Sequence, residues 1–323
     1  MTRRFFKLGL MCVAAMFTLS SQAASAWPDK PITLVVPWPA GGVADLVARI
    51  FAQQVGEPLG ETVIVQNRPG AGTNIGSAYV AEAKPDGYTL LLASSNNAVN
   101  TFLFSNMPYD PIKSFVPISL LVNVPNILVV HPSAAHANSI GKLIDYAKAH
   151  PDELTYASAG NGSPAHLAAE GFKSAADVKI RNITYKGAAP AVTDVMAGRV
   201  SMIFTNIPAS LSAIQSGALL PLGIGSKERS PMLPDVPTIS ESGLPGYEAN
   251  AWYGLMAPAG TPPEVINRLQ EALAAMRKPE VTKLLQERGT VPVISTPEVL
   301  EQQLQTDLQV YGPLIKAAGI TLQ

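Results

Sequence analysis

Two glycine-bearing loops stand where strands are expected to give way to helices, and their residue types suit the binding of an anion. The first loop, Pro37 to Gly42, follows an apolar strand at 32–36, and the second, Ser158-Ala159-Gly160-Asn161-Gly162-Ser163, follows a strand at 155–158. The first turn of a helix has unpaired N–H groups and the positive end of its dipole, which favour a carboxylate or phosphate. Ligands of open α/β sheets bind at the carboxyl ends of the strands. The loops therefore predict an anion site between two domains, with glycines that serve only tight turns as the alternative.

Several side chains near these loops have chemistry that suits a ligand. Asp45 either orients a ligand amine or hydroxyl or stabilises the dipole of its own helix. Arg68 either pairs with an acidic ligand in bidentate fashion or braces its own turn. Trp38 and Tyr185 are predicted walls of the cleft, whereas Trp252 is predicted to lie in the core.

The sequence does not predict catalysis, a cofactor or a metal site. Its histidines are His131, His136, His150 and His166, and no two have the spacing of metal ligands. His166 is predicted to cap or pack against its helix, and a ligand contact or general base is the alternative. The chain lacks the G-x-S-x-G motif of serine hydrolases. The stretch from Gly70 to Gly76 is one residue longer than the dinucleotide motif and lacks the acidic partner for a ribose.

The elements that would position these residues alternate between strand and helix. In the first part we expect strands at 32–36, 62–66 and 89–93 and helices at 44–55 and 73–83. Two extended runs, 116–122 and 127–130, joined by 123–126, then cross into a second α/β unit. There we expect helices at 139–150, 164–176, 188–197 and 208–215, and strands at 155–158, 180–184, 201–205 and 219–225. After an irregular return, a strand at 251–258 and helices at 262–276, 279–287 and 297–316 are expected to pack back on the first unit.

This pattern predicts an α/β protein of two domains, each a sheet flanked by helices, with the ligand in the cleft between them. The predicted first domain comprises residues 27–125 and 250–323, and the second comprises 126–249. The composition agrees with a folded chain, because 47% of the residues are apolar and 15% are charged. Enough apolar surface is present to offset the entropy lost on ordering.

Residues 1–26 are predicted to be a cleaved signal peptide. Arg3, Arg4 and Lys7 precede an apolar run at 8–19, and Ala24-Ser25-Ala26 provides an A-x-A cleavage site. The paired arginines leave open whether the Sec or the twin-arginine system exports the protein. Cleavage removes the one cysteine, Cys12, and three positive charges, so the net charge falls from −1 to −4. A nucleic-acid partner is not expected, because that would require a basic face.

Motifs along the whole mature chain resemble those of one family. The first part carries Val36-Pro37-Trp38-Pro39-Ala40-Gly41-Gly42 with Asp45 and Arg49, Asn67-Arg68-Pro69-Gly70-Ala71-Gly72, and Pro85-Asp86-Gly87-Tyr88-Thr89-Leu90. The second carries Ser158-x-Gly160-x-Gly162-Ser163-x-x-His166-Leu167, Tyr185-Lys186-Gly187 and Ala197-Gly198-Arg199-Val200. The last part carries Arg229-Ser230-Pro231-x-Leu233-Pro234-Asp235-Val236-Pro237-Thr238, Glu241-x-Gly243 and Ala257-Pro258-Ala259-Gly260-Thr261-Pro262. Together these resemble the Bug family of periplasmic solute-binding proteins, the TctC-like receptors of tripartite tricarboxylate transporters.

The resemblance implies a Venus-flytrap fold, similar to type II periplasmic binding proteins, that closes on a small carboxylate without chemistry. It implies a monomer in the periplasm that delivers its ligand to the membrane subunits of a transporter. On this basis the predicted anion cradle is Ala40, Gly41, Gly42 and Gly162. The predicted cleft walls are Trp38 and Tyr185, and the other predicted contacts are Asp45, Asn67, Gly72, Ser158, Ser163, His166, Thr205 and Asn206.

Two departures from the family pattern bear on the ligand. The chain has Phe204-Thr205-Asn206 where the family usually has Phe-Asp-Asn, and Trp38 where it often has Phe. Loss of a carboxylate at position 205 disfavours a ligand with an ammonium group, so we expect a dicarboxylic or aromatic acid. A ligand sensor without a dedicated transporter and an exported nucleotide-dependent oxidoreductase are the alternative functions.

Overall fold

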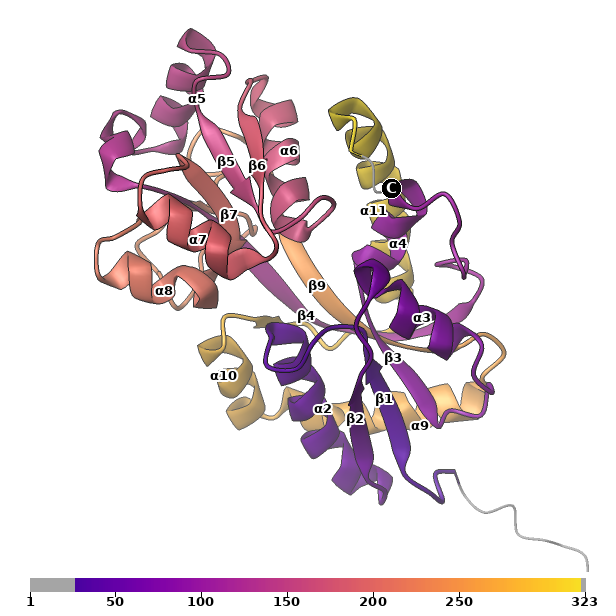
Figure 1. The fold of residues 1–323 in the computed structure, drawn as a ribbon. Helices are drawn as coiled ribbons and strands as arrows, with labels where there is room; N and C mark the ends of the chain where they lie inside the picture. The colour runs from indigo at the N-terminus through magenta and orange to yellow at the C-terminus, as the bar shows by residue number, and fades with distance from the viewer. Residues whose placement is uncertain (1–26, 321–323) are drawn as a thin grey trace, which may run out of the picture.

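The computed structural model describes residues 27–320, except for the side chains of residues 135–137. The predicted signal peptide lies outside the described residues. Within that range the chain forms two α/β lobes that share one curled sheet (Figure 1). This is the two-lobed α/β architecture predicted from the alternation of strands and helices.

The first lobe is a mixed sheet covered by helices on both faces. Strands β1 (Ile32–Val36), β2 (Val63–Asn67) and β3 (Thr89–Ser94) are parallel in the order β2-β1-β3, and β9 (Asn250–Pro258) pairs antiparallel with β3. Helices α2 (Val43–Leu59), α9 (Pro263–Ala272) and α10 (Pro279–Glu287) cover one face. Helices α3 (Asn74–Ala81), α4 (Asn96–Leu103) and α11 (Pro297–Ala318) cover the other face. As predicted, α9 and α10 pack on this lobe, because their apolar sides complete the core against α2.

The second lobe repeats this arrangement with shorter strands. Strand β5 (Thr155–Ser158) lies between β6 (Arg181–Thr184) and β7 (Met202–Asn206), and all three are parallel. Helices α5 (Ile140–Ala149) and α6 (Pro164–Ala176) pack on one face, and α7 (Ala188–Met196) and α8 (Ile207–Gln215) on the other. The remaining elements are β8 (Leu220–Ile224), the two-residue strand β10 (Val291–Pro292), and short 3₁₀ turns η1 (Ala71–Thr73), η2 (Pro132–Ala137) and η3 (Leu273–Arg277).

A single strand, β4 (Phe115–Val130), runs through both lobes. The sequence predicted two runs joined by a connection at 123–126, and this was wrong. Asn and Pro are poor strand residues locally, but pairing with β9 on one side and β10 on the other keeps the segment extended. What changes there is the partner: β4 pairs with β9 through Pro125 and with β7 from Asn126. The division of the domains at 125/126 and 249/250 stays a prediction.

The sequence also missed helix α4. Its start, Asn96-Asn97, and the preceding Ser94-Ser95 have the composition of a turn. In the structure Nδ2 of Asn97 donates to Oγ of Ser77 at 3.1 Å, and Nδ2 of Asn100 donates to the carbonyl oxygen of Gly72 at 2.7 Å. Buried contacts to distant parts of the chain therefore stabilise a helix that local propensity does not indicate.

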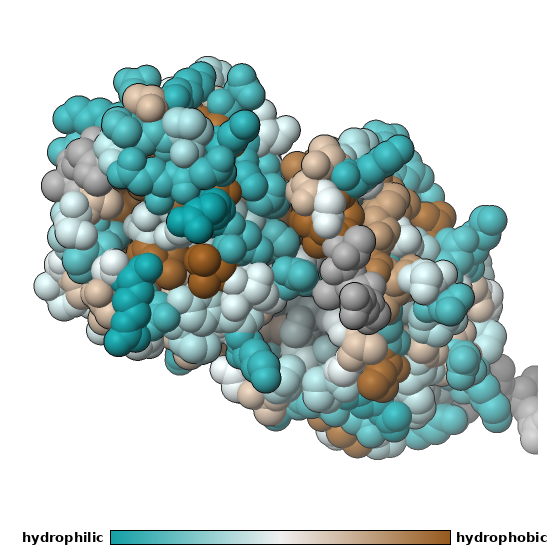
Figure 2. Space-filling model, turned by 45° about the horizontal axis from the view of Figure 1, so that its top comes forward, coloured by the Kyte–Doolittle hydropathy of each residue, from teal (hydrophilic) through white to brown (hydrophobic). Residues whose placement is uncertain are grey.

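The lobes contact each other on both faces of the sheet. On one face, α4 and α11 of the first lobe meet α6 of the second in a buried apolar cluster of Val99, Leu103, Leu167, Ile315 and Ile320. A Cβ atom on Gly162 would lie 2.2 Å from Cδ1 of Leu103. On the other face, a Cβ atom on Gly289 would lie 2.4 Å from Cγ of Pro208. Figure 2 shows a hollow between the lobes, with apolar side chains gathered on the side of the first lobe that faces the second.

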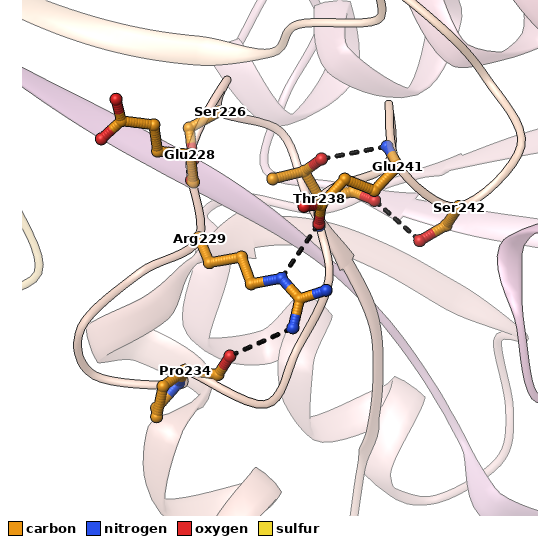
Figure 3. A network of polar contacts seen from close by, with 7 residues as sticks. All are labelled: Ser226, Glu228, Arg229, Pro234, Thr238, Glu241 and Ser242. Atoms are coloured by element: carbon orange, nitrogen blue, oxygen red, sulfur yellow. Dashed lines mark hydrogen bonds and ion pairs between the residues drawn. The ribbon is translucent and has the colours of Figure 1, made fainter.

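The return from β8 to β9 is irregular but tied together by polar contacts (Figure 3). Thr238 and Glu241 form a reciprocal pair: the N–H of Glu241 donates to Oγ1 of Thr238 at 3.0 Å, and the N–H of Thr238 donates to Oε2 of Glu241 at 2.8 Å. Nε of Arg229 donates to the same carboxylate oxygen at 3.0 Å. The backbone N–H of Thr238, followed by Arg229, lowers the pKa of Glu241. This network ties together the irregular segment that precedes β9.

Candidate functional site

The first glycine-bearing loop leads from β1 directly into α2. Gly42 is the N-cap of α2 and has no side chain, so no hydroxyl or carboxylate covers the first turn from that position. Pro39, Ala40, Gly41 and Gly42 are exposed. The backbone N–H groups at the start of α2 lack intrahelical partners, as in any helix, and are open to an anion.

Asp45 holds this loop in place from the first turn of α2. Its Oδ2 accepts from the N–H of Gly41 at 3.1 Å and from Nε of Arg49 at 2.9 Å. Its Oδ1 accepts from Arg49 Nη2 at 3.1 Å and from Nδ2 of Asn67 at 3.0 Å, and Asn67 also donates to the carbonyl oxygen of Trp38 at 3.0 Å. The Arg49 guanidinium is the main cause of a pKa below the ordinary value for Asp45. Both carboxylate oxygens are therefore engaged within the protein, which makes Asp45 and Asn67 braces of the loop.

The second loop leads from β5 into α6 and is held in a similar way. Ser163 is the N-cap of α6 and accepts from the N–H of His166 at 3.3 Å. Nδ1 of His166 accepts from the N–H of Gly162 at 3.1 Å. The imidazole is only 4% exposed, and burial lowers its pKa below 6.5, so it is neutral at pH 7. His166 thus has the packing role predicted from the sequence.

The hydrogen bond at Nδ1 places the His166 proton on Nε2. Nε2 lies 3.3 Å from the side-chain amide of Asn182, and the Asn182 Oδ1 atom as drawn is buried without a partner. Because Nε2–H is a donor, the Asn182 amide is oriented with its oxygen towards Nε2. The tautomer of His166 is then fixed from both sides.

These contacts alter the predicted anion cradle. The N–H groups of Gly41 and Gly162 were both expected to face the ligand, but each donates to a side chain four residues later. Their positive φ values, 92° and 71°, are the reason why glycine stands at these positions. The N–H groups left for a ligand are those of Gly42 and the first turn of α2, and that of Ala165 in α6, because Pro164 has no N–H and the N–H of His166 donates to Ser163.

The other predicted residues of the second lobe lie at the carboxyl ends of its strands. The Ser158 hydroxyl, at the end of β5, is buried without a hydrogen-bond partner. Thr205 is 4% exposed at the end of β7, and Asn206 caps α8 by accepting from the N–H of Ala209 at 3.0 Å. Tyr185 is half-buried, and its hydroxyl donates to Oδ2 of Asp194 at 2.7 Å.

Gly72 and Arg68 have roles inside the first lobe. The carbonyl oxygen of Gly72 accepts from Asn100, which ties its loop to α4. Arg68 stacks on Tyr79 with 3.6 Å between its guanidinium carbon and the ring centroid. This cation–π contact agrees with the brace that was one of the two predictions for Arg68.

Sequence reasoning missed two features at the same edge of the first lobe. One is the run from Ser94 to Asn97 at the carboxyl end of β3, which a polar stretch after a buried strand would have indicated. The other is Tyr253, whose ring lies 5.3 Å from that of Trp38 in an edge-on arrangement. No local signal pairs these residues, because they are distant in sequence. Trp252, as predicted, is in the core, and its Nε1 donates to Asp307 at 2.8 Å.

Metal-binding clusters and membrane-spanning helices were also considered for residues 27–320. Among these residues, no three or more Asp, Glu or His side chains are grouped so that they could hold a metal ion. No helix in this range combines the length and apolar character needed to cross a membrane.

Comparisons with known proteins agree on one family. The model of the family described as "Tripartite tricarboxylate transporter family receptor" matches residues 47–320. Protein BugT of Bordetella pertussis is 37% identical over 326 residues, which cover 100% of this chain and 99% of BugT. The solved structure of R. palustris Rpa4515 with adipate has a TM-score of 0.79 and 36% identity, over 92% of this chain and 100% of that one. MatC from Rhodopseudomonas palustris with bound malate has a TM-score of 0.75 and 30% identity, over 90% and 100% of the two chains.

Proposed function

Because the chain belongs to the tripartite tricarboxylate transporter receptor family, whose fold is that of periplasmic binding proteins, we propose that it captures a small non-amino carboxylate between its lobes. The lobes close on the ligand about the strands that join them, and the loaded receptor delivers it to the membrane subunits of a tripartite transporter. The ligand is a dicarboxylic or aromatic acid. A cleaved signal peptide carries the receptor to the periplasm.

The observation that supports this most directly is the pair of braced loops. Each loop precedes the N-terminus of a helix, α2 in the first lobe and α6 in the second. A carboxylate placed between them would accept hydrogen bonds from helix-end N–H groups and gain from both dipoles. Two relatives of similar fold are recorded with dicarboxylates, adipate and malate.

The residues at the carboxyl ends of the strands support a ligand without an ammonium group. An amino acid needs a counter-charge, and the carboxylate of Asp45 is already paired with Arg49. Thr205, at the end of β7, is uncharged and 4% exposed. Burying an ammonium group without a paired carboxylate would be costly.

A thermal-shift panel tests the class of ligand. The protein, purified from the periplasm of an expression host, is heated with adipate, malate, citrate, benzoate, aspartate, glutamate or NADH. A ligand that binds only the folded state stabilises it by mass action and so raises the melting temperature. At a ligand concentration one hundred times Kd, the free energy of unfolding increases by about 2.7 kcal/mol. We expect the largest rise with a dicarboxylate or benzoate. A larger rise with aspartate or glutamate would contradict the proposal that the ligand lacks an amino group. A rise with NADH alone would contradict the proposed receptor function.

Substitutions at two glycines with the same φ value test whether the lobes close on each other. Gly289 and Gly217 both have φ +75°, so a Cβ atom strains the backbone similarly at each. Only at Gly289 would that atom meet the other lobe, at Pro208. We expect Gly289→Ala to weaken adipate binding and to reduce the ligand-induced compaction in small-angle X-ray scattering, while Gly217→Ala does neither. Equal behaviour of the two variants would contradict closure at this contact.

A further inference from the structure

Tyr253 lies at the edge of the first-lobe sheet that is nearest to the site. On β9 it is paired with Ser94, the last residue of β3, and with Val122 of β4. Its side chain is on the sheet face covered by α2, the same face as that of Trp38 beyond the end of β1. The two rings meet edge to face at 83°, with 5.3 Å between their centroids. Trp38 thereby fixes the orientation of the tyrosine ring beside the first glycine-bearing loop.

The hydroxyl of Tyr253 lacks the hydrogen bond that three buried tyrosine hydroxyls make within the protein. The hydroxyls of Tyr109, Tyr156 and Tyr247 donate to Asn74, Glu170 and the carbonyl oxygen of Ala168. Among the described residues, the Tyr253 hydroxyl has no hydrogen-bond partner. The hydroxyl oxygen of Tyr253 is not fully buried, so solvent can reach it.

Such a hydroxyl is suited to donate to a ligand. Burial raises the pKa of Tyr253 to about 12, so the proton stays on the oxygen throughout the physiological range. The hydroxyl is open to solvent in the ligand-free protein, and a ligand oxygen can take the place of loosely held water there. A hydrogen bond to a charged acceptor is stronger than one to a neutral acceptor.

We propose that the Tyr253 hydroxyl binds the far carboxylate of a dicarboxylic ligand, with its ring held by Trp38, and so selects dicarboxylates over monocarboxylates of equal length. This rests on the proposed function, because the near carboxylate occupies the braced loops. The loops bind any carboxylate, whereas Tyr253 distinguishes ligands by the group at the other end.

Matched ligands and a conservative substitution test this proposal. Affinities for adipate and hexanoate, and for terephthalate and benzoate, are measured by calorimetry for the wild type and for Tyr253→Phe. We expect Tyr253→Phe to weaken binding of a dicarboxylate about tenfold, as for loss of one hydrogen bond to a charged group. The matching monocarboxylate should change by less than about twofold. An equal loss for both members of a pair, or no loss for either, would overturn the proposal.

The melting temperature of the ligand-free protein gives a second readout that does not depend on which acid binds. Because the Tyr253 hydroxyl has no partner in the protein, Tyr253→Phe should leave this temperature unchanged. The control, Tyr109→Phe, removes the bond to Asn74 and should lower the melting temperature without altering the preference for dicarboxylates. A fall for Tyr253→Phe like that of the control would show a structural hydroxyl and overturn the proposal. A wild type that binds none of the carboxylates would contradict the proposed function instead.

Discussion

The two glycine-bearing loops have the same geometry but different chemistry. In each loop the N–H of a glycine donates to a side chain four residues later, in the first turn of the following helix. In the first lobe the acceptor is the Asp45 carboxylate, which is charged and shared with Arg49 and Asn67. In the second lobe it is the imidazole of His166, which is neutral and buried.

The difference shows two ways to fix a loop at a proposed anion site without repelling the anion. A carboxylate near a bound anion is unfavourable unless its charge is offset, and Arg49 provides the offset for Asp45. A neutral imidazole needs no counter-charge, but burial must keep it neutral. The first brace is therefore expected to tolerate mild acid, whereas the second is expected to fail there.

The largest effect is expected from Asp45→Ala. Without the carboxylate, Gly41, Asn67 and Arg49 lose a shared acceptor, and the bond from Asn67 to the carbonyl oxygen of Trp38 is left to hold the first loop. Charged hydrogen bonds contribute about 1.5–3 kcal/mol each, so we expect Kd for adipate, measured by calorimetry, to rise about tenfold or more.

The control for Asp45→Ala is Asp110→Ala. Asp110 also braces its own loop, by accepting from the N–H groups of Ile112 and Lys113 at 2.9 Å, and it belongs to neither glycine-bearing loop. Asp110→Ala should lower the melting temperature of the protein without changing its affinity for adipate. Equal changes in affinity for the two variants would mean that Asp45 affects binding only through overall stability.

A smaller effect is expected at His166, because one neutral hydrogen bond contributes about 1 kcal/mol. His166→Ala should raise Kd about fivefold. His166→Asn should remain near the wild type, because the amide oxygen can replace Nδ1 as acceptor for the N–H of Gly162. If both variants lose the same affinity, the ring itself matters and the hydrogen bond to Gly162 does not.

The smallest effect is expected from pH. The pKa of His166 is lowered in the folded state, so its contribution to stability is complete above pH 6.5 and is lost as the pH falls through 6.5 towards the folded value. The corresponding loss for Asp45 begins only below pH 3.8. Adipate affinity should thus weaken between pH 7.5 and 5 in the wild type, and His166→Asn should remove the part of this dependence that does not come from protonation of adipate itself. A variant that keeps the wild-type profile would assign the titration to another group.

Melting temperature over the same pH range includes an opposing contribution from Asp307. Burial raises the pKa of this carboxyl to about 6, with Trp252 and Gln303 as its hydrogen-bond donors. A raised carboxyl pKa means that the folded state binds the proton more tightly, so stability increases as the pH falls from 6 to 3.8. Asp307→Asn is therefore the background in which the effect of His166 on melting temperature is best measured.

Much of the fold could be predicted because it depends on local patterns. Alternating strands and helices, the proline at the start of α6 and its serine cap follow from spacing and from short-range hydrogen bonds. The two loops were predicted as the candidate site for the same reason, since a glycine turn before a helix leaves N–H groups exposed wherever the helix lies.

The wrong predictions concern segments whose structure depends on residues that are distant in the sequence. The segment 123–126 is extended because β9 and β10 pair with it, and α4 is a helix because Asn97 and Asn100 donate to the distant, buried side chains of Ser77 and Asn74. Neither partner is visible in the local sequence. Local propensity is weaker than these tertiary contacts.

The sequence by itself determined the two-lobed α/β architecture, the positions of both glycine-bearing loops and the family resemblance. Only the tertiary structure decided what the side chains around the loops do. It joined the Asp45 carboxylate to Gly41, Arg49 and Asn67 and placed Tyr253 beside Trp38. The physical reason is that a polar side chain binds whichever partner the fold brings within about 3 Å, and that partner is set by packing between segments far apart in the chain.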